Sequence, residues 1–576
     1  MPDKFTLNDA YKRFTGDQDK VLTPRKTIDN FMQKAAGAGL DILKETRRVD
    51  RGRLGIPVYS SICGQDAKNM TGTAKQMGKG ATPVQAEASA IMELVERFSL
   101  YRFSANPANF QTDRQADLKD KSMSFAVLAR SVDDISGNID AVGRFFADLP
   151  LRWTTAWNLT RGEKVLLPFD WFFAINQFNG SCAGNCNEEA LCQGICEVVE
   201  RHVCCDIARH RLLTPAIRPE SADHPAVVEM IARYHAAGIR IYLSDFTMGL
   251  GLPTVGVLAH DPATFPDRSE LVWTAGTAPD PRKAMSRALT EAAQLGGDFD
   301  TGACYVASGL PKFRRLEEAS FITGLTPYLD ITDLPDLSHE NIRVEVERCL
   351  STLADHNLEV YIVETTDPLL GLPAFYIIIP GTRFLQRAEN ASAGMFTAKL
   401  AAEKFPPREA VARLTAMNDM VGPAYYISFY LGQSHLQAGD PEAALTHFYR
   451  ALELDPSPED SPAIYSAIGQ VFKDRGQYRK ALKAFEDGLA IDDERTDILN
   501  LAGFCHFKLG EYEKAVERFA AILALDPSSA IDYANMAVNY RALGQINKAL
   551  YYYQQALALD PAIEFARQHL EEILAR

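Results

Sequence analysis

The chain has 576 residues, which is too long for a single hydrophobic core and predicts two to four domains. Hydrophobic residues make up 47% of it, as in ordinary globular proteins, and the formal net charge of −15 argues against a nucleic-acid-binding surface spread over the whole molecule. It shows neither an apolar signal core nor an uninterrupted run of about 18 apolar residues. We expect a cytoplasmic protein without membrane segments or direct nucleic-acid contacts, with its ten cysteines reduced.

Three segments in the first 400 residues share one helical pattern, namely 81–103, 187–209 and 280–297. In each of them, three polar residues follow the spacing i, i+4, i+7, which places them within an arc of about 60° on one helix face. The triplets are Ser89, Glu93 and Glu96; Gln193, Glu197 and Glu200; and Arg287, Glu291 and Gln294. The shared spacing predicts three related α/β units whose helices bring these polar stripes together.

The stripes concentrate carboxylates. Four of these would meet if the first two helices lie side by side: Glu93, Glu96, Glu197 and Glu200. Partly buried carboxylates in a cluster need cations, and an oxygen-only ligand set is typical of Mg²⁺ bound together with phosphates. The side chains suited to phosphate oxygens are Lys79, Arg97, Arg201 and Arg287. The pattern predicts a site for Mg²⁺ and a phosphate-bearing ligand, whereas any single stripe alone is also compatible with a solvated helix face.

The common nucleotide-binding loops do not occur in the sequence. Residues 72–80, GTAKQMGKG, place five residues between Gly72 and Gly78, where the phosphate-binding loop has four. No G-x-G-x-x-G opens a helix after a strand, and no protein-kinase signature appears. The turn FNGSCAGN, 178–185, precedes the second helix and would suit an anion, although a plain turn fits as well. A nucleotide would therefore bind by a less common route.

Six of the ten cysteines lie between Cys182 and Cys205, a density typical of metal or redox sites. The positions of the first four, 182, 186, 192 and 196, match neither a zinc nor an iron–sulfur signature. On the helix 187–209, Cys192 falls on the apolar side together with Val199 and Val203. We therefore interpret these cysteines as small buried apolar residues.

The last third of the chain is repetitive, with units at 431–456, 468–493, 502–527 and 536–561. One glycine recurs 37, 34 and 34 residues apart, at Gly439, Gly476, Gly510 and Gly544. A helix–turn–helix of this length with glycine at the turn resembles the tetratricopeptide repeat, and 561–576 is typical of a capping helix. The resemblance implies that the repeats bind a protein or peptide on their concave face or associate with themselves. The alternative is a passive scaffold.

Four sequence blocks in the first domain resemble the YcaO family over about residues 50–405. The first is S-x-x-x-E-x-x-E-R at 89–97, which follows GKGAT at 78–82. The second joins NG-x-x-AGN at 179–185 to E-A-x-x-Q-x-x-x-E-x-x-E-R at 189–201. The third is R-A-L-x-E-A-x-Q at 287–294, and the closing block is the strand-like GLPAFYIIIPG at 371–381.

This resemblance implies an enzyme that binds ATP and Mg²⁺ without a phosphate loop and phosphorylates a backbone amide oxygen of a peptide. A nucleophile then attacks the amide carbon and gives an azoline or a thioamide. The resemblance implies that Glu93, Glu96, Glu197 and Glu200 hold Mg²⁺ and that Ser89, Glu189, Gln193, Arg287 and Gln294 contact the nucleotide. We add Lys79, Arg97, Arg201 and Glu291 to the expected nucleotide site.

The C-terminal repeats differ from the Pro-rich tail of azoline-forming members and are similar to members associated with methylthiolation of a ribosomal protein. We expect a peptide or protein substrate brought by the repeats or by a separate partner, and a homodimer is compatible with the sequence. The alternatives are an ATP-binding adaptor that catalyses no modification, and a Mg-ATP ligase that activates a carboxylate.

The sequence thus predicts four regions. Residues 1–50 form an N-terminal extension, 51–405 a YcaO-like α/β (α+β) catalytic domain of three pseudo-repeated helix-on-sheet units, 406–423 a linker, and 424–576 an all-α repeat solenoid.

Overall fold

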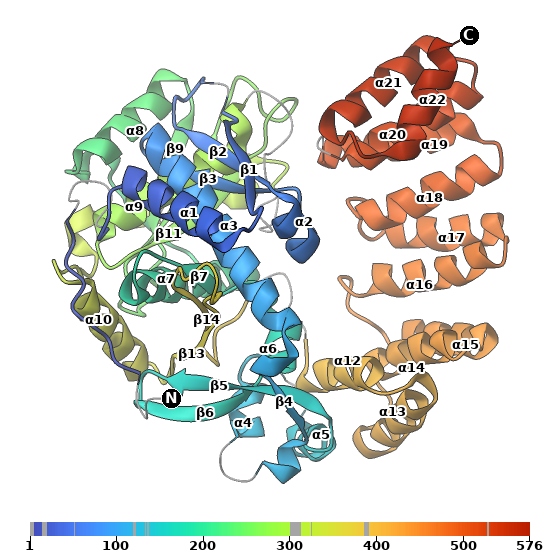
Figure 1. Cartoon of the computed structure of the whole chain (residues 1–576), viewed down its shortest axis with the longest axis horizontal. Helices are drawn as coiled ribbons and strands as arrows, with labels where there is room; N and C mark the ends of the chain where they lie inside the picture. Colours follow the sequence, from blue (N-terminus) through green and yellow to red (C-terminus); the bar gives the residue numbers. More distant parts are fainter. Residues whose placement is uncertain are drawn as a thin grey trace. The chain divides into compact units, whose positions relative to one another are not determined.

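Figure 1 shows the computed structural model of the chain, which describes residues 5–13, 20–50, 52–118, 122–132, 134, 137–299, 313–323, 325–384, 391–526 and 529–575. The chain divides into two compact units. Unit 1 comprises Met1–Ile139 and Phe146–Phe396, and unit 2 comprises Asp140–Phe145 and Thr397–Arg576. Within the described ranges, the helices are all too short or too polar to cross a bilayer.

The first sheet of unit 1 is antiparallel, and its strands are β1 (Leu43–Arg48), β2 (Val58–Cys63) and β3 (Lys75–Lys79). Three helices accompany it: α1 (Pro24–Ala38), α2 (Gln65–Thr71) and the long α3 (Pro83–Ala105). Pro83 at the first position and a capping box between Thr82 and Gln85 fix the start of α3. Residues 1–50, expected to be an extension, therefore contribute a helix and a strand to this unit.

The second sheet has five strands: β11 (Val272–Thr277), β10 (Thr254–His260), β9 (Arg240–Asp245), β8 (Pro215–Ile217) and β12 (Leu325–Leu329). The pairs are antiparallel except for β8 with β12, which is parallel. Two helices pack beside it: α8 (Pro225–Ala236) and α9 (Pro281–Gly296). All residues of β10 and β11 are buried, because α9 lies directly on these two strands.

The third sheet has six strands: β4 (Gln111–Asp113), β5 (Leu151–Asn158), β13 (Tyr361–Glu364), β14 (Ala374–Ile378), β7 (Ser181–Ala183), and β6 (Glu163–Pro168) paired to β5. The helices of this region are α4 (Phe125–Ala129), α6 (Phe169–Asn176), α7 (Asn187–His210) and α10 (Ile342–Asp355). α7 packs on β7 and β14, and α10 packs against α7. Unit 1 therefore contains three sheets, each carrying one of the three predicted helices (Figure 1).

Each of these helices approaches its sheet at an equivalent position. A Cβ atom added to Gly78 of β3 would lie 2.0 Å from the backbone nitrogen of Ala90 in α3, and one added to Gly276 of β11 would lie 2.5 Å from a backbone nitrogen of α9. On α7 the small residue is Gly194, where an added Cβ would lie 2.6 Å from Sγ of Cys182. In each helix, the residue at the close contact comes directly after the first polar residue of the stripe. The contacts therefore fix the rotation of each helix and the direction of its stripe.

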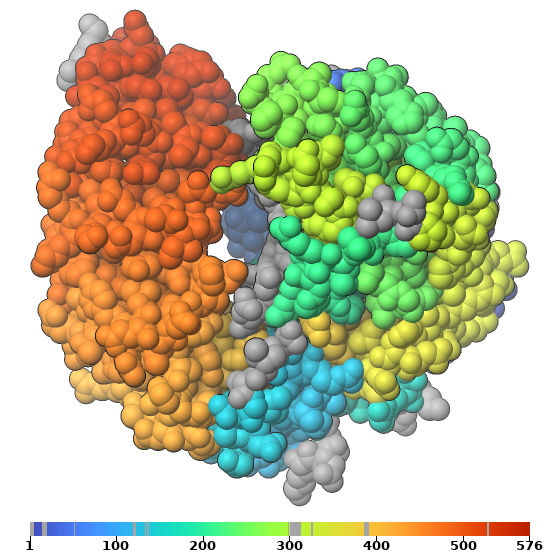
Figure 2. Space-filling model, turned by 180° about the vertical axis from the view of Figure 1, so that it is seen from behind, coloured from blue at the N-terminus to red at the C-terminus, as the bar shows by residue number. Residues whose placement is uncertain are grey.

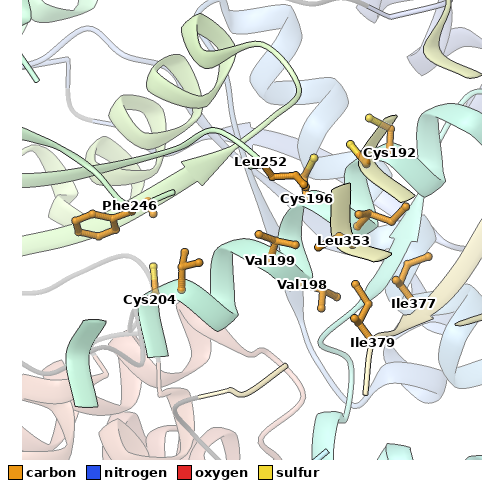
Figure 3. Packing of buried hydrophobic residues seen from close by; sticks show 14 of the residues in the cluster. Cys192, Cys196, Val198, Val199, Cys204, Phe246, Leu252, Leu353, Ile377 and Ile379 are labelled. Carbon is orange, nitrogen blue, oxygen red and sulfur yellow. The ribbon is translucent and has the colours of Figure 1, made fainter. Parts of the chain in front are cut away.

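The cysteines of segment 182–205 contribute to the core of unit 1. Those that are buried are Cys182, Cys192, Cys196, Cys204 and Cys205, and Cys186 is half-buried. Figure 3 shows Cys192, Cys196 and Cys204 in one apolar cluster with aliphatic residues such as Val199 and Ile377. Burial raises the pKa of the Cys204 thiol well above its ordinary value, which favours the neutral form. The nine described cysteines are all free thiols.

Unit 2 consists mainly of paired helices, and its part after residue 397 is coloured orange to red in Figure 2. Its helices are α5 (Ile139–Phe146), α12 (Ala393–Lys404), α13 (Pro407–Val421), α14 (Tyr425–Gln437), α15 (Pro441–Glu453), α16 (Ser461–Asp474), α17 (Tyr478–Leu489), α18 (Thr496–Lys508), α19 (Tyr512–Leu525), α20 (Ala530–Ala542), α21 (Ile546–Leu559) and α22 (Glu564–Leu574). The units α14–α15, α16–α17, α18–α19 and α20–α21 are the four predicted repeats, and α22 follows them at the expected capping position.

Glycine serves two purposes in the repeats. The inter-helix turns place it in the left-handed region, with φ of 83°, 71°, 74° and 72° at Gly439, Gly476, Gly510 and Gly544. Inside the first helix of three repeats, glycine makes room for an aromatic ring of the second helix. An added Cβ on Gly469, for example, would lie 2.2 Å from the Phe485 ring. This close approach explains why the repeats combine small and aromatic residues.

The segment 406–423, predicted to be a linker, is mostly the helix α13. Ala410, Leu414 and Met417 recur at i, i+4, i+7 and are buried. This apolar stripe holds the segment in helical form, because an amphipathic helix is stabilised by burial of its apolar face. The connection between the two regions is therefore structured at this point.

Candidate functional site

The three polar stripes line one cavity of about 790 Å³ in unit 1. All thirteen side chains singled out from the sequence contribute to its wall: Lys79, Ser89, Glu93, Glu96, Arg97, Glu189, Gln193, Glu197, Glu200, Arg201, Arg287, Glu291 and Gln294. They come from the end of β3 and from α3, α7 and α9. The volume lies within the range of about 300–1,000 Å³ that is common for small-molecule sites.

Glu96 and Arg97 of α3 are part of a hydrogen-bonded network with the turn before β7. The Ser181 hydroxyl donates to Oε1 of Glu96 at 2.6 Å, and Nη1 of Arg97 donates to the same oxygen at 2.6 Å. The Arg97 guanidinium lies 4.1 Å from the ring centroid of Phe178 and 3.5 Å from Oε1 of Glu93. One arginine thus balances two carboxylates and is held in place by an aromatic ring.

On α7, Glu197 pairs with an arginine one turn later. Nη2 and Nε of Arg201 donate to Oε1 of Glu197 at 2.9 and 3.0 Å. The neighbouring Glu200 accepts a hydrogen bond of 2.8 Å from the backbone N–H of Thr277 at the end of β11. These contacts orient both carboxylates toward the space between α3, α7 and α9.

Charged side chains of α9 connect this helix to its neighbours. Nη1 of Arg287 donates to Gln193 Oε1 at 2.6 Å, and its Nη2 lies 4.0 Å from Oε2 of Glu200. Lys79 forms an ion pair with Glu291. Burial, together with the positive charge of Arg287, lowers the pKa of Lys79 to about 8. The cavity therefore holds a lysine that loses its proton more readily than an exposed lysine does.

The carboxylates are crowded in a buried place. Burial raises the pKa of Glu93 and raises that of Glu96 to about 8, although Arg97 opposes both changes. Burial alone would also raise the pKa of Glu197, but Arg201 and Arg97 outweigh it and lower that pKa. The arginines stabilise part of the negative charge, and a cation would stabilise the remainder.

The residues present fit ATP with Mg²⁺. Three buried polar atoms of the wall, Oδ1 of Asn179, Oδ1 of Asn185 and Nε of Arg287, have no hydrogen-bond partner among the described residues. A polar, anionic ligand would satisfy the arginine. In the part of the chain that the structure describes, no three acidic, histidine or cysteine side chains form a closed metal-binding set. Mg²⁺ commonly uses only one or two protein carboxylates, and phosphates and water complete its shell.

The N-terminal segment reaches the same cavity, which the sequence analysis did not foresee. Lys12 and Lys20 line it. Nζ of Lys20 lies 3.6 Å from Oε1 of Glu189, and the backbone N–H of Val21 donates to Oε2 of Glu189 at 3.3 Å. Lys12 forms a buried ion pair of 2.6 Å with Glu345 of α10. No local pattern around these lysines indicates contacts with residues so distant in the sequence.

Two parts of the chain match known protein families. A family model described as YcaO cyclodehydratase, ATP- and Mg²⁺-binding, matches residues 77–383, which is more than half of the chain. Tetratricopeptide-repeat models match residues 424–494, 473–537 and 530–563.

Several proteins are similar to the first part of the chain. An uncharacterized protein of Methanothermobacter thermautotrophicus is 29% identical over 63% of this chain and 94% of its own length. The ribosomal protein S12 methylthiotransferase accessory factor YcaO of Escherichia coli is 27% identical over 54% of this chain and 58% of its own. A solved heterocyclase in complex with substrate and cofactor has a TM-score of 0.53 at 23% identity over 66% of this chain. This chain spans 54% of that heterocyclase, and the likeness shows a shared fold.

The three helix-on-sheet units and their cavity define an ATP- and Mg²⁺-binding enzyme domain. The chain belongs to the YcaO family and carries C-terminal tetratricopeptide repeats. Its cofactors are ATP and Mg²⁺, and it is an enzyme of the ATP-dependent YcaO kind.

Proposed function

We propose that this protein uses Mg²⁺-ATP to phosphorylate the oxygen of a backbone amide in a peptide or protein. The observation that carries the proposal is the convergence of three polar stripes on one cavity in a chain of this family. Bound ATP would supply the γ-phosphoryl group, and the resulting phosphate is a far better leaving group than the amide oxygen. A nucleophile would then attack the amide carbon.

The side chains of the cavity suit this chemistry. Phosphoryl transfer needs positioning and neutralisation of charge more than a covalent nucleophile. Mg²⁺ would be held by Glu93, Glu96, Glu197 and Glu200. The phosphates would be bound by Lys79, Arg97, Arg201 and Arg287. The remainder of the nucleotide would be positioned by Ser89, Glu189, Gln193, Glu291 and Gln294.

We infer that the product is a thioamide or an azoline, or that the protein assists methylthiolation of a ribosomal protein. The name of the Escherichia coli relative, an accessory factor of the ribosomal protein S12 methylthiotransferase, supports the last of these. The solved heterocyclase with bound substrate shares the fold, which is compatible with a peptide as substrate.

The repeats would recruit the substrate protein or a partner, since stacked helix pairs present extended binding surfaces. Exposed aromatic residues of unit 2, such as Phe504 and Tyr551, offer anchors for such contacts. The same repeats favour a second candidate function, namely an ATP-binding adaptor that recruits a partner and modifies nothing. We also propose that the protein forms a homodimer, which self-association through the repeats would produce.

One experiment separates the two functions. The protein is mixed with Mg²⁺-ATP and candidate peptides encoded by neighbouring genes, with and without sulfide, and ADP and peptide mass are followed. We expect ADP to form only with the substrate peptide, whose mass changes by exchange of oxygen for sulfur or by loss of water. ATP binding without ADP formation, with every peptide tested, would favour the adaptor.

A further inference from the structure

We infer that the cavity contains a subsite for the target amide, in which the carboxamide of Asn179 hydrogen-bonds to the N–H group of the peptide backbone. This inference rests on the proposed function and specifies where its substrate lies. Asn179 lines the cavity and is only 5% exposed, and its Oδ1 has no hydrogen-bond partner among the described residues. Buried carbonyl oxygens without a partner are rare, so this atom points to a ligand that completes its bonding.

The position of Asn179 separates it from Glu189, one of the groups proposed to position the nucleotide. The wall of the cavity includes α7 residues from Glu189 to Cys204, which are fifteen helical steps or about 22 Å apart. The unpartnered oxygen of Asn185 lies at the Glu189 end, because its side-chain amide donates to Glu189 at 2.9 Å.

Asn179 lies farther along α7 than Glu189. A Cβ atom added to its neighbour Gly180 would be 3.3 Å from Cγ2 of Val198, which is nine residues or about 14 Å of helix from Glu189. The residue before Asn179, Phe178, carries the Arg97 guanidinium on its ring and accepts a 3.3 Å hydrogen bond from Arg97 at its backbone oxygen. Tyr101, one turn after Arg97 on α3, also lines the cavity. Two unmatched amide oxygens, those of Asn185 and Asn179, therefore lie apart along α7, as a site for two substrates requires.

The backbone holds Asn179 in place. Gln177 has φ 50° and ψ −114°, a conformation that residues with a side chain rarely adopt, and Gly180 has φ 91°. A Cβ atom on Gly180 would lie 2.3 Å from the backbone oxygen of Ile377, and the Ile377 N–H donates to the Gly180 oxygen at 2.7 Å. A strained turn fixed by its surroundings is a common feature of ligand sites.

The chemistry of the carboxamide suits a peptide bond. A neutral acceptor beside crowded carboxylates adds no further negative charge. By accepting the N–H of a secondary amide, Asn179 would increase the electron density on the carbonyl oxygen, which is the atom to be phosphorylated. It would also orient that oxygen toward the space between the glutamates. The expected ligand is therefore a secondary amide, and an ester of the same shape should bind less well.

The test compares N-methylacetamide, the smallest such secondary amide, with methyl acetate, an ester of the same shape that has no N–H. Binding of each to the full chain with Mg²⁺ and β,γ-methylene ATP is measured by saturation-transfer NMR. We expect the wild-type protein to bind the amide about three- to tenfold more tightly than the ester, as one hydrogen bond implies. Asn179→Ala should abolish this preference, whereas Asn179→Asp, which retains an acceptor oxygen, should keep it.

Two controls accompany these variants. Asn185→Ala should keep the preference for the amide, since it alters the Glu189 end. An unchanged dissociation constant of Asn179→Ala for β,γ-methylene ATP shows that this variant is folded. Equal binding of amide and ester by the wild type, an unchanged preference in Asn179→Ala, or no saturable binding of either probe overturns the inference. The ATP analogue does not react, so a negative result with these probes concerns only this inference. The proposed function is tested separately, by ADP formation with a substrate peptide.

Discussion

Arg97 and Arg201 each follow a glutamate directly in the sequence, and each contacts a carboxylate of its own helix in the structure. The position after Glu96 or Glu200 lies about 100° around the helix, so the long arginine side chains reach back to the stripe instead of belonging to it. Sequence spacing predicted the stripes. It did not predict that Ser181 and the Thr277 N–H would hold Glu96 and Glu200, because these contacts cross between sheets.

Removal of a single carboxylate should weaken the metal-dependent part of ATP binding. We expect Glu93→Gln to lower ATP affinity in Mg²⁺ by at least about tenfold, since even groups that only support metal ligands contribute this much. Titration calorimetry with Mg²⁺ and with EDTA measures it. Glu87→Gln is the matched control, because Glu87 lies on the same helix and accepts a hydrogen bond from Thr46 outside the cavity wall. Equal affinities of both variants would contradict the proposed Mg²⁺ site.

ATP affinity should depend on pH through Lys79. Burial and Arg287 lower its pKa to about 8, so the lysine loses its proton as the pH rises through this value. Phosphate favours the protonated form, so the contribution of Lys79 to the affinity should fall above pH 8 by up to about tenfold per pH unit. Glu96, whose pKa is also about 8, ionises over the same range in wild type and in Lys79→Arg, so the difference between the two profiles reports the lysine. Titrations from below to above this pH measure the change. Lys79→Arg, which stays charged, should flatten the profile, and an equally steep decline in that variant would refute the role of Lys79.

At the scale of elements, α3, α7 and α9 lie on their sheets in one register. Small residues at Gly78, Gly194 and Gly276 allow this approach, and they hold the polar stripes at matching rotations. The sequence predicted three related helices from their polar spacing alone. It did not indicate the close strand contacts, because a lone glycine in a strand-like segment has several explanations.

Gly78→Ala should destabilise unit 1. The added methyl group meets the backbone of α3 at 2.0 Å, and overpacking of this kind typically costs about 1–3 kcal/mol in the free energy of unfolding. Urea denaturation followed by tryptophan fluorescence measures it, and Gly276→Ala should behave in the same way. Gly37→Ala in α1 is the control, because an added Cβ there has open space and a helical Gly-to-Ala change stabilises by up to about 1 kcal/mol. Wild-type stability of both strand variants would refute the packing argument.

At the scale of the whole molecule, the two units have separate apolar clusters. One set lies among the sheets of unit 1, and the other set follows the repeats of unit 2. The chain therefore combines a site-bearing α/β unit with a quasi-linear helical unit, and their stabilities depend on different contacts.

The two units should unfold in distinguishable transitions. All four tryptophans, Trp153, Trp157, Trp171 and Trp273, belong to unit 1, so fluorescence reports this unit, whereas circular dichroism reports helices of both. Mg²⁺-ATP at about 100 times its dissociation constant should stabilise the fluorescence-detected transition by about 2.7 kcal/mol. Phe485→Ala should shift only the other transition, because its ring is fully buried in the repeats. Coincident transitions that move together would contradict this expectation.

The sequence by itself determined the repeats and the three polar stripes, because helical periodicity and repeat length are properties of neighbouring residues. The resemblance to a family and the charge of single side chains added the other four of the thirteen residues that line the cavity. Only the tertiary structure decided that residues near the N-terminus add a strand to unit 1 and two lysines to the cavity wall. It also decided that 406–423 is largely helical and that Oδ1 of the buried Asn179 has no hydrogen-bond partner among the described residues. Each of these depends on how separate sheets and helices pack against one another, and local spacing carries no information on contacts between residues that are distant in the chain.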